Sequence, residues 1–221
     1  MAPYIGTPTS RVDGRAKVTG AARYAAEFNR PDMVHGCVVT ATITRGRIAR
    51  IDTSAALGTT GVIAVLTHEN RPAMAEDDEA YKDDTAPDGT PFRPLYDGVI
   101  RFDRQPIAVV LAESWDIARS AAALVRTEYE AAAHETDLEG RAGAASASAT
   151  NGFAVVDTTA PRGDAEKAFA AAEVRHQASY RIPVEHHNPK ELFGSTVIWE
   201  GGGRITVYDK TQGVQNVHKY L

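Results

Sequence analysis

Residues 105–130, which read QPIAVVLAESWDIARSAAALVRTEYE, decide the fold of this chain. The run Pro106–Ala112 is apolar, β-branched and of strand length, so it predicts a buried strand. Ser114 is a residue type that caps helices, and the helix predicted after it carries one small apolar face. That face consists of Ala118, Ala121, Ala122 and Val125. Beyond Leu124 the alternation of apolar and polar residues predicts a second strand, so the stretch reads strand, helix, strand.

The same order of elements occurs upstream. Three segments have the composition or the alternation of strands: 34–43, 47–52 and 61–67. Residues 53–57 predict one or two helical turns between the second and third of these strands, and residues 98–101 predict a further strand. We therefore expect residues 20–133 to form one α+β domain with an α/β-like order of elements. The acidic, proline-rich stretch 68–96 within it predicts a long, solvated surface loop.

The rest of the chain divides into three parts. Residues 1–19 are polar and rich in Pro, Gly and Thr, which predicts an extended N-terminal arm. Residues 134–160 predict a linker, because much of this stretch consists of small and polar residues with little apolar surface to bury. Residues 161–221 predict the start of a second α+β domain that is incomplete. Its expected elements are a helix at 163–172, a strand at 174–182, a hairpin of 193–199 with 204–208, and a helix from Val214 in which we expect the chain to be cut off at Leu221.

Composition and charge exclude several classes of protein. The formal net charge of -5 and the pI near 5.8 argue against a nucleic-acid-binding surface. No apolar stretch approaches the ~20 residues of a membrane span, and the N-terminus lacks the pattern of a signal peptide. We expect a soluble, cytoplasmic protein, with export as the passenger of a signal-bearing partner as the alternative. Cys37 is the only cysteine, so this chain alone forms no disulfide or iron–sulfur cluster, and its apolar neighbours predict a buried structural thiol.

Residue types alone predict no active site. Gly201–Gly203 lack the lysine and the strand-then-helix context of a phosphate loop, so they predict a hairpin turn. Glu185-His186-His187, followed by Glu191, lacks the helical His-Glu-x-x-His spacing of a metal site. We expect the two histidines to be a hydrogen-bonded structural pair in a turn near Pro189. The acidic run 76–79 lacks the alternating oxygen donors of a calcium loop and predicts a solvated surface.

Several motifs together resemble one protein family. They are Arg11-Val12-Asp13-Gly14-Arg15-Ala16-Lys17-Val18-Thr19-Gly20, Gln105-Pro106 with the strand after it, Val125-Arg126-Thr127-Glu128-Tyr129-Glu130, Arg162-Gly163-Asp164, His187-Asn188-Pro189-Lys190-Glu191-Leu192-Phe193 and Tyr208-Asp209-Lys210-Thr211-Gln212-Gly213-Val214. This set is similar to the N-terminal part of the molybdenum-binding subunits of the xanthine dehydrogenase and aldehyde oxidase family. Two residues depart from the family pattern. Arg104 stands where glycine is usual before the Gln-Pro pair, and Lys190 replaces a methionine.

The resemblance implies a fold and a cofactor. The fold is an a/b hammerhead domain followed by an incomplete α+β molybdopterin-binding domain. The cofactor is a molybdopterin-type molybdenum cofactor in the full-length subunit, with 2Fe-2S clusters and FAD on partner subunits. The Gly-Gly-Gly-Phe-Gly cofactor loop and a glutamate base lie downstream in the family, so the resemblance places no catalytic residue and no metal ligand within this chain. Gln212 is the one residue that matches a position near the metal centre, where its amide can donate a hydrogen bond to an oxo ligand. Glu191 matches a motif position to which we assign a structural role.

Three hypotheses about function follow. The first is an enzyme part: the front of the molybdenum subunit of a heterotrimeric hydroxylase, which oxidises aldehydes, or N-heterocycles such as xanthine, with oxygen from water. It needs the missing C-terminal part of that subunit, an FAD-binding subunit and a 2Fe-2S subunit. The wording of the motifs around Glu191 and Gln212 favours the aldehyde oxidoreductases slightly. The second is a non-catalytic docking or assembly module. The third and least favoured is an unrelated metal hydrolase centred on His186 and His187.

Overall fold

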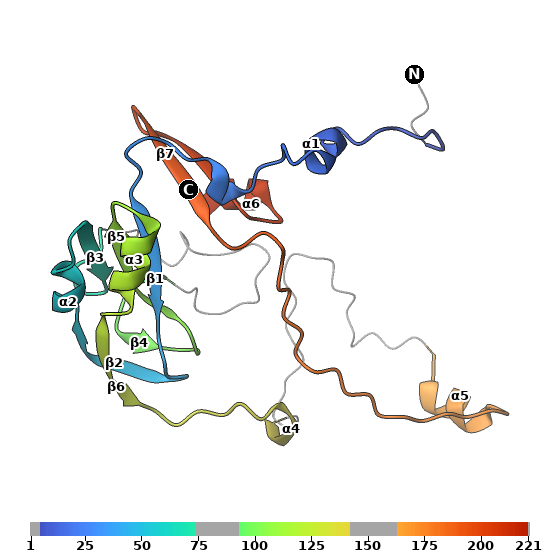
Figure 1. The fold of residues 1–221 in the computed structure, drawn as a ribbon. Coiled ribbons are helices and arrows are strands. Elements are labelled where there is room, and N and C mark those ends of the chain that lie inside the picture. The colour runs from blue at the N-terminus through green and yellow to red at the C-terminus, as the bar shows by residue number, and fades with distance from the viewer. Residues whose placement is uncertain (1–4, 74–92, 142–162, 221) are drawn as a thin grey trace. The chain divides into compact units, whose positions relative to one another are not determined.

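The computed structural model describes residues 5–73, 93–141 and 163–220, and it divides into two compact units (Figure 1). One unit is residues 32–181, and the other joins residues 1–31 to residues 182–221. We call them the sheet unit and the hairpin unit. The sequence segments 76–79 and 142–160, which were expected to be a solvated acidic run and most of a linker, lie outside the described residues. The predicted domain boundaries therefore stay predictions, while the two units are described separately below.

The sheet unit contains two antiparallel, three-stranded sheets. The first has the order β1-β5-β3, and its strands are His35–Thr40, Pro106–Ala112 and Val62–Thr67. The second has the order β4-β2-β6, and its strands are Val99–Ile100, Gly46–Asp52 and Arg126–Ala131. Helices α2 (Ser54–Leu57) and α3 (Trp115–Ala122) belong to the same unit, and α3 packs on β1 and β5 (Figure 1). The mixed fold predicted from residues 105–130 and their upstream counterparts is confirmed.

The core of this unit lies between the first sheet and its helices. Its buried side chains are small: Ala56, Val65, Ala108, Val110, Ala121 and Val125. Alanines on α3 and on β5 let the helix approach the sheet closely, which is why the alanine-rich face predicted from the sequence is the buried face. Ser114 caps α3 as predicted, since its Oγ accepts a hydrogen bond from the Ile117 amide at 3.3 Å. A second cluster of Ala41, Ile100 and Ile107 fills the space beside the second sheet.

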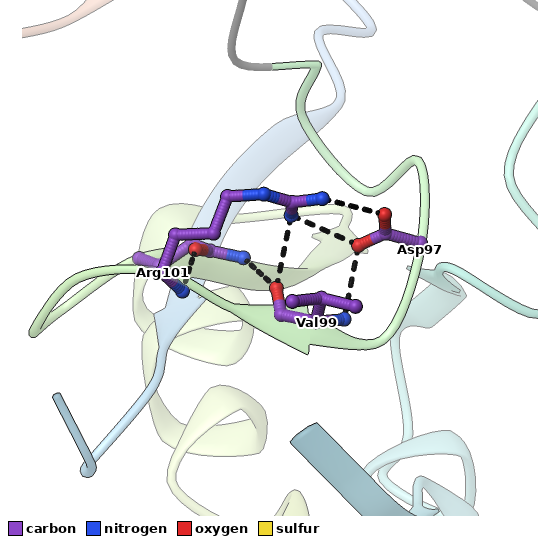
Figure 2. A network of polar contacts seen from close by, with 4 residues as sticks. Asp97, Val99 and Arg101 are labelled. Carbon is purple, nitrogen blue, oxygen red and sulfur yellow. Dashed lines mark hydrogen bonds and ion pairs between the residues drawn. The ribbon is translucent and has the colours of Figure 1, made fainter. Parts of the chain in front are cut away.

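Gln105 closes the turn between β4 and β5 through its side-chain amide. Its side chain is buried, with Oε1 accepting from the Arg101 amide at 2.8 Å and Nε2 donating to the Val99 carbonyl at 2.7 Å. Figure 2 shows Arg101 donating to Asp97, at 2.8 Å, and to the Val99 carbonyl in the same turn. The hydrogen bond from the Arg101 guanidinium holds the pKa of the Asp97 carboxyl below its ordinary value. The turn forces Arg104 into the left-handed region, at a φ of 60°. Glycine adopts this conformation without a steric penalty, which gives a physical reason for the glycine that the resemblance leads us to expect here.

The hairpin unit is built around β7 (Ser195–Gly201) and β8 (Arg204–Asp209), which pair antiparallel. Gly201, Gly202 and Gly203 all have positive φ, between 61° and 78°, so the glycine run forms the predicted turn. Helix α6 spans Val214–Tyr220 and the 3-10 helix η1 spans Ala25–Glu27. The N-terminal arm, expected to be extended, contains the helix α1 at Gly14–Val18. Its first turn is tied by the ion pair of Lys17 with Asp13, an i,i+4 pair that the arm's polar composition did not reveal.

One further expectation requires correction. The strand predicted at 174–182 is absent, and Val174, Tyr180 and Ile182 are more than 80% exposed. The alternation there is typical of a strand, but no neighbouring strand within the described residues provides hydrogen-bond partners. In the stretch predicted as a linker, 134–160, the described residues include the short helix α4 at Leu138–Arg141, and the linker itself stays a prediction. Helix α5 at Ala165–Ala171 agrees with the prediction, and Asp164 caps it by accepting a hydrogen bond from the Lys167 amide at 2.9 Å.

Candidate functional site

The candidate site residue Gln212 lies in the loop between β8 and α6. It is exposed, and within the described part of the chain its side chain makes no hydrogen bond. The loop around it is shaped locally, because the Gly213 amide donates to the Thr211 hydroxyl at 3.0 Å. This short turn leaves the Gln212 amide free to donate to a group from outside the chain. A primary amide offers two N–H donors and a carbonyl acceptor and carries no charge.

Two contacts with aromatic rings fix the end of β8 from which this loop starts. The ammonium nitrogen of Lys210 lies 3.7 Å from the centroid of the Phe193 ring, so the start of the loop is anchored to the segment before β7. Tyr208, two residues earlier, stacks on Phe28 with ring centroids 3.7 Å apart and an interplanar angle of 4°. The loop therefore begins from a braced strand, although the Gln212 side chain itself is unrestrained.

Glu191 ties the N-terminal segment to the hairpin, which agrees with the structural role expected for it. Its Oε1 accepts a hydrogen bond from the Ala25 amide at 2.9 Å. Thr196, a buried residue of β7, donates its hydroxyl to the Ala25 carbonyl, also at 2.9 Å. Both backbone polar groups of Ala25 are therefore satisfied by side chains about 170 positions later, as the separations of 166 and 171 residues show. This pairing makes residues 25–28 part of the hairpin unit.

The two histidines do not form the pair expected from the sequence. His186 and His187 are exposed, and no hydrogen bond joins either of them to another described residue. The segment that carries them has no described neighbour to pack against, so nothing brings the two rings into a bonded arrangement. Within the described residues, no group of three His, Cys, Asp or Glu side chains gathers closely enough to hold a metal ion.

The environment of Cys37 differs from the prediction. Cys37 lies on β1 and is only half-buried, whereas the sequence predicted a buried thiol. Burial nevertheless raises the pKa of the Cys37 thiol, which favours the unreactive protonated form.

Sequence reasoning missed the open groove beside α6, lined by Ile205, Val207, Val214 and Val217. Its signal was present in the alternation of β8 and in the i,i+3 spacing of the two helix valines.

Two family models match this chain, one over the part of the sequence that forms the two sheets of the sheet unit and one over the C-terminal part. Residues 19–133 match the family model described as aldehyde oxidase and xanthine dehydrogenase, a/b hammerhead domain. Residues 146–221 match the model of a molybdopterin cofactor-binding domain. The two matches together cover the chain from residue 19 onward, apart from residues 134–145 between them. None of the helices in the described residues is long and apolar enough to cross a membrane.

Three relatives illustrate the similarity. The chain is 33% identical over 210 residues to the aldehyde oxidoreductase molybdenum-binding subunit PaoC of Escherichia coli K12, covering 94% of this chain and 26% of that protein. It is 30% identical to the xanthine dehydrogenase molybdenum-binding subunit of another Escherichia coli strain, with 91% and 27% covered. Quinoline 2-oxidoreductase from Pseudomonas putida 86 is 28% identical, with a TM-score of 0.51, and the match covers 65% of this chain and 18% of that one. The chain thus spans about a quarter of the length of these two curated relatives.

Proposed function

Because the chain belongs to the aldehyde oxidase and xanthine dehydrogenase family, we propose that it is the front part of the molybdenum-cofactor subunit of a molybdenum hydroxylase. The carrying observation is the joint match of a hammerhead domain and a cofactor-binding domain along one chain, in that order. The complete enzyme would oxidise an aldehyde, or an N-heterocycle such as xanthine, with oxygen derived from water. Electrons would leave through 2Fe-2S clusters and FAD on partner subunits. The similarity to PaoC supports an aldehyde as the first substrate to test.

The residues of this chain fit the cofactor at one point. When bound, a molybdopterin-type cofactor supplies the metal and the redox chemistry of the hydroxylation. Gln212 has an exposed amide without a described partner, and a neutral N–H donor suits an oxo ligand. A single donor cannot hold a cofactor, since a functional site needs a complete and preorganised set of contacts. The chain's own part is therefore to present this amide from the loop braced by Lys210 and Tyr208.

The test compares the isolated chain with a reconstituted assembly. We expect the purified 221-residue chain to contain no molybdenum by elemental analysis and to show no aldehyde-dependent reduction of a dye. Co-expression with the rest of a molybdenum subunit, and with FAD-binding and 2Fe-2S subunits, should yield about one molybdenum per complex. A complete assembly that binds no molybdenum would contradict the proposal. Stoichiometric molybdenum in the isolated chain would contradict the inactivity that we assign to it.

The alternative is a docking or assembly module without chemistry of its own. One observation favours it: apolar side chains of the hairpin unit are exposed, among them Val197, Trp199 and Val214. An exposed apolar surface on an otherwise charged chain is typical of an interaction site. Under this alternative the chain would associate with partner subunits, and the complex would still contain no molybdenum.

A further inference from the structure

The hairpin has one covered face and one open face. The register places Val197 opposite Val207 and Trp199 opposite Ile205, and side chains of one such pair lie on the same face of a sheet. The alternate residues Thr196 and Tyr208 form the other face, which the N-terminal segment covers through Ala25 and Phe28. On the open face Trp199 is 68% exposed, Val197 60% and Ile205 41%. We call the set Val197, Trp199, Ile205 and Val207 the open face.

The open face continues into a groove beside helix α6. The groove has a volume of about 530 Å³, and Ile205 and Val207 of the open face line it together with Val214 and Val217. Polar residues also line it: Glu200, Arg204, Asp209, Thr211 and His218. The Asp209 carboxylate is already used by the Ser195 hydroxyl, and that of Glu200 by the Thr206 hydroxyl. Protein interfaces commonly combine apolar residues with polar residues in this way.

No layer covers the open face of the hairpin within the described residues, and Trp199 on this face is 68% exposed. An isolated two-stranded sheet is marginally stable in water, and packing on both faces is what normally stabilises it. Here η1 covers one face, whereas the other presents a tryptophan and two β-branched side chains to solvent. Exposed apolar groups that are contiguous over two strands and a helix favour a partner surface over scattered surface residues.

We propose that the open face and its groove are the docking surface for the rest of a molybdenum-binding subunit, a polypeptide that presents apolar side chains to Trp199 and to the α6 groove. The proposal rests on the proposed function. Two observations select this occupant. The open face lies within residues 146–221, which match a cofactor-binding domain, and the matching part of the relatives is only about a quarter of their length. In such relatives about three quarters of the subunit is available to cover this face.

The experiment measures association between two separately encoded polypeptides. The tagged 221-residue chain is co-expressed with the part of PaoC that it does not match, and the mass of the purified complex is determined. As a reference, PaoC is divided at the same place and its own two parts are co-expressed as a pair. We expect a one-to-one complex, and we expect Trp199→Glu to weaken it at least about tenfold, because a buried tryptophan anchor is typically worth that much or more. The matched control is Val38→Glu, a strand residue of the sheet unit that is 52% exposed and should leave the association unchanged.

Several outcomes would overturn the proposal. Complex formation that Trp199→Glu leaves intact would mean that another surface makes the contact. No complex with this chain, when the reference pair associates, would also contradict it. A dimer of the isolated chain in sedimentation, dissolved by Trp199→Glu, would show that a second copy occupies the face. As a second measurement, the Trp115→Phe variant leaves Trp199 as the single tryptophan, and its emission should shift to the blue when a partner segment that lacks tryptophan binds.

The proposed function and the docking surface fail in different ways. A complex that forms through Trp199 but holds no molybdenum would remove the function and keep the docking surface. A complex that holds molybdenum and whose association is unchanged by Trp199→Glu would keep the proposed function and remove the docking surface.

Discussion

The sheet unit and the hairpin unit contain similar strands but differ in how they bury them. In the sheet unit, α2 and α3 cover one sheet, and the buried side chains come from strands of both sheets and from the two helices. In the hairpin unit the buried residues are Ala25 and Thr196 among those that the structure describes, and the larger apolar side chains stay exposed. Secondary structure forms in both, because it follows local pattern. A core forms only where a second layer is present.

The difference should be largest in hydrogen exchange of the isolated chain. We expect the amides of β5 to exchange on the order of a hundredfold more slowly than those of β7 and β8, since opening the hairpin disrupts little apolar burial. Mass spectrometry of overlapping peptides measures both regions in one sample. Equal protection of β5 and β7 would mean that the hairpin unit is complete by itself, and the comparison would fail.

Core substitutions should give the next largest difference between the two units, measured as the loss of unfolding free energy. Ile100, 1% exposed in the second cluster of the sheet unit, should cost about 2–5 kcal/mol of unfolding free energy when changed to Ala. Trp199→Ala in the hairpin unit should change the stability of the isolated chain by less than about 0.5 kcal/mol, because most of its side chain is already in water. Chemical denaturation of both variants gives the two values. A large loss from Trp199→Ala would indicate that the open face is covered in the isolated chain.

The link between Ala25 and the hairpin tests a buried contact of the second unit. Thr196→Val removes the hydroxyl that donates to the Ala25 carbonyl, and we expect a loss of about 1 kcal/mol. The readout is the exposure of residues 25–28, measured by proteolysis or by exchange of the same peptides. Thr196→Ser, which keeps the hydroxyl, is the control and should retain most of the protection.

Arg104→Gly should act in the opposite direction. The φ of 60° at Arg104 is strained for a residue with a Cβ, so glycine should stabilise the sheet unit by roughly 1 kcal/mol. Part of that gain is lost to the greater freedom of glycine in the unfolded chain, so the net rise should be about 0.5 kcal/mol. A rise in thermal midpoint checks this. Arg104→Ala keeps the strain and should leave the midpoint nearly unchanged, and a stabilising effect of that variant would contradict the argument.

The smallest effect concerns pH. The hydrogen bond from Arg101 lowers the pKa of Asp97 in the folded chain, so ionised Asp97 stabilises the fold. For a lowered pKa, that stability is present above the ordinary carboxyl pKa of about 4 and is lost as the pH falls through the folded value. We expect Asp97→Asn to destabilise the chain slightly at neutral pH and to have a diminishing effect below about pH 4. Denaturation curves over a pH series measure this, and an effect that grows toward acid would give the wrong sign.

The turn at Gln105 shows the limit of sequence reasoning in the well-packed unit. The Gln-Pro motif located the turn and the strand after it. The two backbone hydrogen bonds of the Gln105 side chain, and the strained φ of Arg104, follow from the path of the chain between β4 and β5. Local pattern contains no information about which backbone groups a buried amide will meet.

Residues 174–187 show a different limit. The alternation at 174–182 is typical of a strand, but a strand also requires a neighbour, and none is present in the described residues. The two histidines were expected to be bonded to each other, yet they are exposed, because no other described segment packs against theirs. Gln212 was identified through the family resemblance, and its role at a cofactor stays a prediction.

By itself the sequence determined most of the strand and helix order of residues 34–131, the glycine turn of the hairpin and the family, because these depend on local periodicity and on motifs. Only the tertiary structure decided that Glu191 and Thr196 bind Ala25, and that Trp199 and the α6 groove stand open. The physical reason is the sequence separation over which each kind of interaction acts. A helix or turn is stabilised within a few residues, whereas burial depends on which distant segments are present to supply the opposite surface.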